Sequence, residues 1–171
     1  DETGGQTDIT YEGSDCTAAS QADPAANSKR CFPQYYAPPD TAAGWSWWNK
    51  YRVKTVTEKD LVGGSPDVLN SYAYSTTGAS TSVLWHHNDT DKWALPLPKR
   101  TWSDWRGYSS VVVTTGASGG TRTKSEYRYF RGLLGDRTDT GPADRSSTLT
   151  DFGGAVWQDL GHRAGALFEA M

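Results

Sequence analysis

The chain has 171 residues, enough for one domain, and a formal net charge of −3. This near-neutral charge excludes electrostatic attraction to nucleic acid as a basis for function, and no apolar run approaches the roughly 18 residues of a membrane span. Leu, Ile, Val and Phe form only about 14% of the chain, a level typical of disorder, but 8 Trp and 9 Tyr supply large apolar surfaces. We therefore expect an ordered chain with an aromatic core.

The composition favours strands over helices. The chain contains 18 Gly and 8 Pro, which interrupt helices, and many Thr, Val, Tyr and Trp residues, which suit a pleated surface. The sequence predicts two regions: an irregular N-terminal segment over residues 1–50, and an antiparallel β-hairpin region over residues 51–171. Within the first region, only residues 7–11 read as a short strand.

The chain has two cysteines, Cys16 and Cys31, and the stretch between them is small, polar and typical of a surface loop. A disulfide closing about 15 residues stabilises a fold by roughly 3 kcal/mol on the chain-entropy model. We therefore predict a Cys16–Cys31 disulfide and an oxidising compartment, which means a secreted or cell-surface protein. A zinc site is the weaker alternative, because two thiolates without a neighbouring histidine are only half a ligand shell.

Three hairpins are predicted from alternating polarity and turn residues. The first joins residues 51–61 to 68–75 across Gly63 and Gly64, the second joins 108–116 to 121–130, and the third spans 146–161 and turns at Gly153 and Gly154. Residues 76–107 are predicted to be an ordered, irregular segment that aromatic side chains hold in place, with one short strand. Residues 131–145 are predicted to be a loop. The tail at 163–171 fits either a helical turn or a strand.

Several segments together resemble the actinobacterial RHS/YD-repeat proteins in their order and spacing, over roughly residues 10–168. They are WWNKYRVKTVTEKDLVGGSPDVLNSYAYS, KRTWSDWRGYSSVVVTTG, SEYRYFRGLLGDR and SSTLTDFGG, and the Cys16–Cys31 loop with CFPQYY resembles the N-terminal portion of that family. The chain departs from the YD pattern because no Tyr-Asp dipeptide precedes a Gly-Arg-Leu run, and Asp151-Phe152-Gly153 only loosely matches that motif.

This resemblance implies an all-β fold, an antiparallel hairpin-rich curved open sheet of the kind that forms a YD-repeat shell. It implies a non-catalytic structural segment of a secreted, toxin-associated protein, without cofactors. The expected partners are neighbouring β-hairpin segments of the parent chain and an enclosed C-terminal effector. The abrupt start at Asp1 and the end at Met171 are those expected of an excised piece of such a wall.

No catalytic residue and no metal ligand is predicted. The sequence lacks the GxSxG, HExxH, GxGxxG and P-loop motifs. The richest polar cluster is His86 to Asp91, where Asn88, Asp89 and Asp91 could offer oxygens to Ca²⁺, but the glycine and distal glutamate of an EF-hand are missing. The adjacent histidines would face opposite sides of a strand, so this cluster reads as a polar loop tip.

The tryptophans support a second hypothesis, a secreted carbohydrate-binding module or adhesin domain. Exposed aromatic side chains near polar groups mark binding surfaces. The same side chains are also the expected core of a chain with so few aliphatic residues. The candidate binding surface comprises Trp45, Trp47, Trp48, Trp85 and Trp93.

Overall fold

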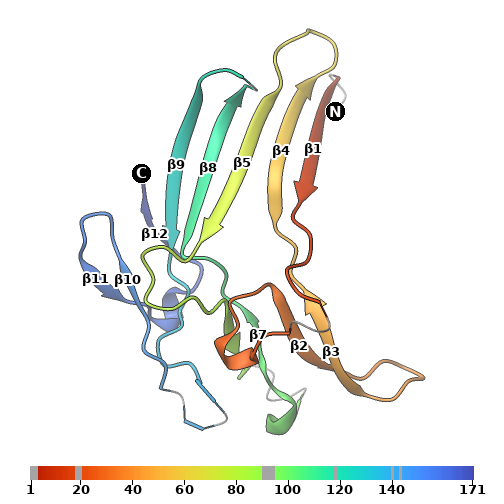
Figure 1. Ribbon diagram of the computed structural model, residues 1–171, viewed down its shortest axis with the longest axis vertical. Coiled ribbons are helices and arrows are strands. Elements are labelled where there is room, and N and C mark those ends of the chain that lie inside the picture. The colour runs from red at the N-terminus through yellow and green to blue at the C-terminus, as the bar shows by residue number, and fades with distance from the viewer. Residues whose placement is uncertain (1–3, 18–20, 90–94, 118, 140, 143) are drawn as a thin grey trace.

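The computed structural model describes residues 4–17, 21–89, 95–117, 119–139, 141–142 and 144–171. The described residues form antiparallel strands and short 3-10 turns, which confirms the expected all-β, hairpin-rich open architecture (Figure 1). No helix in the described ranges has the length and apolarity needed to cross a membrane.

One large sheet dominates the fold. It contains β1 (Gly5–Tyr11), β4 (Val53–Asp60), β5 (Val68–Ser75), β8 (Ser110–Ala117), β9 (Arg122–Tyr129) and β12 (Leu167–Ala170), in that spatial order. The predicted hairpins β4–β5 and β8–β9 are confirmed, and they lie side by side because β5 pairs with β8.

In the described residues, three smaller ladders lie outside this sheet, two in a base below it and one beside its lower end (Figure 1). They pair β2 (Cys31–Tyr36) with β3 (Gly44–Asn49), β6 (Trp85–His87) with β7 (Trp102–Trp105), and β10 (Thr148–Thr150) with β11 (Val156–Gln158). The β10–β11 pair is the third predicted hairpin. The 3-10 turns are η1 (Pro24–Ala26), η3 (Leu97–Lys99) and η4 (Gly161–Arg163).

The N-terminal segment is more regular than its sequence predicts. Residues 1–50 were expected to be irregular, yet they contain β1, which includes the short strand expected at 7–11, and the β2–β3 ladder. Local patterns reveal only part of β1 and nothing of the β2–β3 ladder, for two reasons. The partner of β1 is distant in sequence, since Gly5 lies opposite Asp60, and Pro33 within β2 argues against a strand.

The core lies in the base and is aromatic, as the composition predicts. Trp85, Trp102, Leu84 and Ala25 form the buried cluster, and Phe32, Trp105 and Tyr108 pack against it. Trp85 is central, because its ring centroid lies 4.3 Å from that of Phe32 on β2 and 4.7 Å from that of Trp105 on β7.

The large sheet, in contrast, is a single layer. Ser110 is the only residue in its six strands that is buried, and the other strand residues are partly or fully exposed. In Figure 1 no other segment crosses the upper half of the sheet. The sheet therefore has no second layer over most of its length among the described residues.

The two faces of the sheet differ in chemistry. Cross-strand register places Tyr72 opposite Val113, and Val111 opposite Tyr127, so one face carries tyrosine and valine side chains. The other face carries polar pairs, among them Asp8 with Lys59 (2.6 Å) and Ser110 with Glu126 (3.0 Å). Both hairpins therefore place their tyrosines on the same side of the sheet.

The β4–β5 turn is closed by the carboxylate of Asp60. One oxygen accepts the backbone N–H groups of Val62 (2.9 Å) and Gly63 (2.7 Å), and the other accepts that of Ser65 (3.3 Å). These backbone hydrogen bonds favour the ionised form and lower the pKa of Asp60 from 3.8 to about 2.

We expect the order of this turn to be pH-dependent. Because the pKa of Asp60 is lower in the folded state, the carboxylate stabilises the turn above its ordinary pKa, and this contribution is lost as pH falls through about 2. The amide NMR shifts of Val62 and Gly63 should titrate with a midpoint at a pH of about 2. Asp60→Asn should abolish that titration. A midpoint near 3.8 in the wild type would show that the carboxylate does not cap the turn.

Candidate functional site

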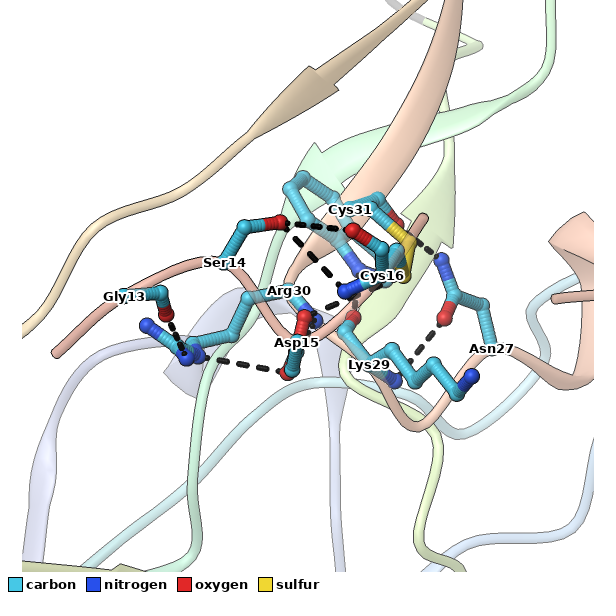
Figure 2. Close-up of a disulfide and its surroundings, with 9 residues drawn as sticks. Gly13, Ser14, Asp15, Cys16, Asn27, Lys29, Arg30 and Cys31 are labelled. Carbon is cyan, nitrogen blue, oxygen red and sulfur yellow. Dashed lines mark hydrogen bonds and ion pairs between the residues drawn. A yellow bond between two sulfur atoms is a disulfide. The ribbon is translucent and has the colours of Figure 1, made fainter. Parts of the chain in front are cut away.

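The predicted disulfide between Cys16 and Cys31 is confirmed, with the two Cα atoms 6.0 Å apart. Figure 2 shows how hydrogen bonds fix the chain around it. The Asp15 carboxylate accepts the backbone N–H of Arg30 (3.0 Å), and the Arg30 guanidinium donates to the carbonyl of Gly13 (2.5 Å). The disulfide and these bonds attach the coil after β1 to the start of β2.

The disulfide also bears on metal binding. Within the described ranges, the one group of three potential ligands is Asp15, Cys16 and Cys31. The two sulfur atoms are bonded to each other, so they do not offer the thiolates that a zinc ion requires.

The β2–β3 ladder presents the exposed part of the predicted tryptophan surface. Trp45 and Trp48 are 50% and 47% exposed, and Trp47 is partly buried. Each exposed indole is held by a tyrosine of the neighbouring strand. Tyr35 meets Trp45 at 5.6 Å and Tyr36 meets Trp48 at 5.9 Å, both nearly at right angles. All three tryptophans lie on this short ladder, with Trp45 and Trp47 on one face and Trp48 on the other.

The other two predicted members do not join them. Trp85 is 1% exposed, and its indole N–H donates to the carbonyl of Lys29 at 2.8 Å, so its assignment to a binding surface was wrong. It is a core residue because β6 packs against β2 through Phe32. Trp93 lies outside the described residues.

A pocket of about 270 Å³ opens beside this ladder. Its lining combines the disulfide, two indoles and uncharged polar side chains, from Ser14, Cys16, Thr17, Gln21, Cys31, Trp47, Trp48 and Asn49. Both amide atoms of Asn49 are buried without a hydrogen-bond partner. A buried amide without a hydrogen-bond partner destabilises the fold by about 1–3 kcal/mol. The Asn49 amide is therefore a candidate contact for a ligand of this pocket.

The cluster at residues 86–91 was predicted to be a polar loop tip, and this was wrong for His86 and His87, which end strand β6. The cluster is described as far as Asp89, and Asp91 lies outside the described residues. His87 is buried, and its Nδ1 lies 2.9 Å from a carboxylate oxygen of Asp89, which also pairs with Arg137 at 3.3 Å. Burial raises the pKa of Asp89, but the hydrogen bond from His87 and the charge of Arg137 outweigh it and leave the pKa below its ordinary value. This carboxylate therefore links His87 at the end of β6 to Arg137 in the 131–145 segment.

Buried charges in residues 131–159 are a feature that the sequence did not reveal. Arg131 is fully buried and donates to the carbonyls of Val83 (2.7 Å) and Thr81 (2.8 Å). Burial lowers the pKa of Arg131 to about 10, even though the nearby Asp159 carboxylate opposes this change. Asp136 is likewise buried and pairs with Arg145 at 3.2 Å. These pairs fix the predicted loop to the base.

No protein-family model, no curated protein and no solved structure matches this chain.

Proposed function

We propose that this chain is a non-catalytic wall segment of a secreted RHS/YD-repeat β-shell of a toxin-associated protein. In such a wall, neighbouring hairpin segments of the parent chain continue the sheet, and one face looks into a hollow that holds a C-terminal effector. The observation that carries the proposal is the single-layer sheet, in which Ser110 is the only buried residue of six strands. A sheet normally buries one face against a second layer.

The chemistry of the two faces supports this role. Tyr72, Val113 and Tyr127 lie on one face, and the described residues cover this face only near the base, where Tyr74 contacts Arg52 and Tyr108. The opposite face carries polar pairs such as Asp8 with Lys59 and Ser110 with Glu126, together with Leu69 and Val112. A wall separates two environments, and a sheet whose hairpin tyrosines lie on one face is suited to that position.

The edges of the sheet support it as well. Leu61 donates its backbone N–H to the carbonyl of Gly4. Gly4 and Leu61 are therefore a hydrogen-bonded pair, next to the Gly5–Asp60 pair of the ladder. Because hydrogen-bonded and non-hydrogen-bonded residues alternate along an antiparallel pair, the backbone N–H groups of Thr7 and Ile9 point away from β4. In the described residues no strand pairs with that side of β1.

Further support comes from the disulfide and from the polar side chains. Disulfides persist in oxidising compartments, which is consistent with a secreted protein. Asp159, for example, is buried and accepts the backbone N–H groups of Arg131 and Gly132, so its carboxylate has structural partners.

We expect the isolated chain to associate through the open edge of β1, because unpaired backbone groups recruit further strands. Sedimentation equilibrium over a concentration series should show reversible association. Thr7→Pro removes an outward N–H without breaking the ladder to β4, and it should weaken association by about tenfold or more.

Thr7→Val is the matched control, because it keeps the outward N–H, and it should associate like the wild type. A wild-type chain that stays monomeric and melts at the same temperature at every concentration would contradict the wall proposal.

A further inference from the structure

The aromatic row on β3 leads directly into the pocket beside the disulfide. Trp45, Trp47 and Asn49 alternate along the strand and so share one face, with Asn49 at the pocket end. On β2, Tyr35 lies opposite Trp45. Lys99 lies 4.3 Å from the centre of the Tyr35 ring and donates to its hydroxyl at 3.1 Å. Tyr35 and Trp45 are thus fixed in place, while half of the Trp45 surface stays exposed.

The described side chains that line the pocket are uncharged. The Cys16–Cys31 disulfide forms part of its wall and ties that wall to β2. The polar lining consists of hydroxyl and amide side chains, from Ser14, Thr17, Gln21 and Asn49, and no acidic or basic residue is among the described lining residues. Such a lining selects a neutral ligand with many hydroxyl groups over an ion.

Asn49 supplies the second, independent observation. Its amide has one acceptor oxygen and a donor NH₂ group, and both are buried and unpaired in the described structure. Two neighbouring hydroxyls of a sugar offer the complementary pair, since one can donate to the oxygen while the other accepts from the nitrogen. A ligand that meets both would remove an existing cost in free energy.

We propose that the β2–β3 ladder binds a neutral oligosaccharide. Sugar rings lie with their apolar C–H faces on the indoles of Trp45 and Trp47, and one terminal or branching sugar enters the pocket. The two polar atoms of Asn49 are buried in the absence of ligand, so the Asn49 side chain turns toward the sugar to bond it. This inference stands apart from the wall proposal, because it uses neither the large sheet nor its edges. Aromatic grooves also bind proline-rich peptides, but proline residues offer carbonyl acceptors and no backbone N–H donor, so such a peptide would leave the acceptor oxygen of the Asn49 amide unpaired.

Isothermal titration calorimetry of the full chain tests the proposal with cellohexaose, chitohexaose and mannohexaose as neutral probes. A heparin-derived hexasaccharide serves as the anionic probe and decaproline as the peptide probe. We expect saturable binding of at least one neutral hexasaccharide, and weaker or no binding of the other two probes. No binding of any neutral probe at about 1 mM, or tighter binding of decaproline, would overturn the proposal.

Three variants locate the site. Trp45→Ala and Asn49→Leu should each weaken sugar binding by about tenfold or more. Asn49→Leu should leave the melting temperature unchanged or raise it, because it removes an unpaired buried amide, and this outcome separates a ligand contact from a structural one. Trp157→Ala is the control, since Trp157 is also 48% exposed but lies on β11, and its sugar affinity should be unchanged. Equal affinity in all three variants would exclude the β2–β3 ladder as the site.

Discussion

Replacing Trp85 by alanine is expected to lower the free energy of unfolding by about 3–5 kcal/mol, the usual cost of removing a large buried aromatic side chain. Trp85 is 1% exposed and packs against Phe32 and Trp105. Its indole N–H also bonds the carbonyl of Lys29, which alanine would leave without that donor. The loss is large because the base holds the main buried cluster, while the sheet above it buries little.

Urea unfolding of the wild type and the variant measures this difference. Trp48→Ala is the matched control, since Trp48 is 47% exposed and its removal should cost about 1 kcal/mol or less. Equal losses in the two variants would mean that Trp85 is not central to the core.

Asp159→Ala should cost a similar amount, about 3–5 kcal/mol, although its side chain is small. The buried Asp159 carboxylate accepts the successive backbone N–H groups of Arg131 (2.8 Å), Gly132 (2.6 Å) and Leu133 (3.2 Å), and the hydroxyl of Ser147 (2.9 Å). Alanine would leave these buried donors without an acceptor. It would also remove the negative charge that offsets the charge of the buried Arg131 guanidinium.

Asp159→Asn gives a graded comparison. It keeps the volume and one acceptor oxygen, so it should cost less than Asp159→Ala but more than an exposed substitution. Thermal and urea unfolding of both variants would measure the order. If Asp159→Ala unfolds like the wild type, the carboxylate does not hold the chain after β9 in place.

The local parts of the fold were predictable because each depends on residues close in sequence. Alternating polarity on both sides of Gly63 and Gly64 indicates β4–β5, and Gly153 and Gly154 mark the turn of β10–β11 in the same way. The disulfide was predictable because the chain has only two cysteines, which flank a polar loop.

The long-range parts were not predictable from local patterns. Nothing near β1 indicates that it pairs with β4, and nothing near Arg131 indicates that its backbone N–H bonds a carboxylate 28 residues away. The tryptophans show the same limit at the candidate site. Trp45 and Trp85 both lie in short polar–aromatic strands, and only the packing of β6 on β2 makes one exposed and the other buried.

Residue-resolved amide hydrogen exchange across a protein concentration series tests most directly whether further strands pair with the open edge of β1. The amides of Thr7 and Ile9, which point outward from β1, should be unprotected at low protein concentration and become protected as concentration rises. The amide of Asp8, which faces β4, is the internal reference and should be protected throughout. Exchange at Thr7 and Ile9 that stays fast at every concentration would contradict the wall proposal.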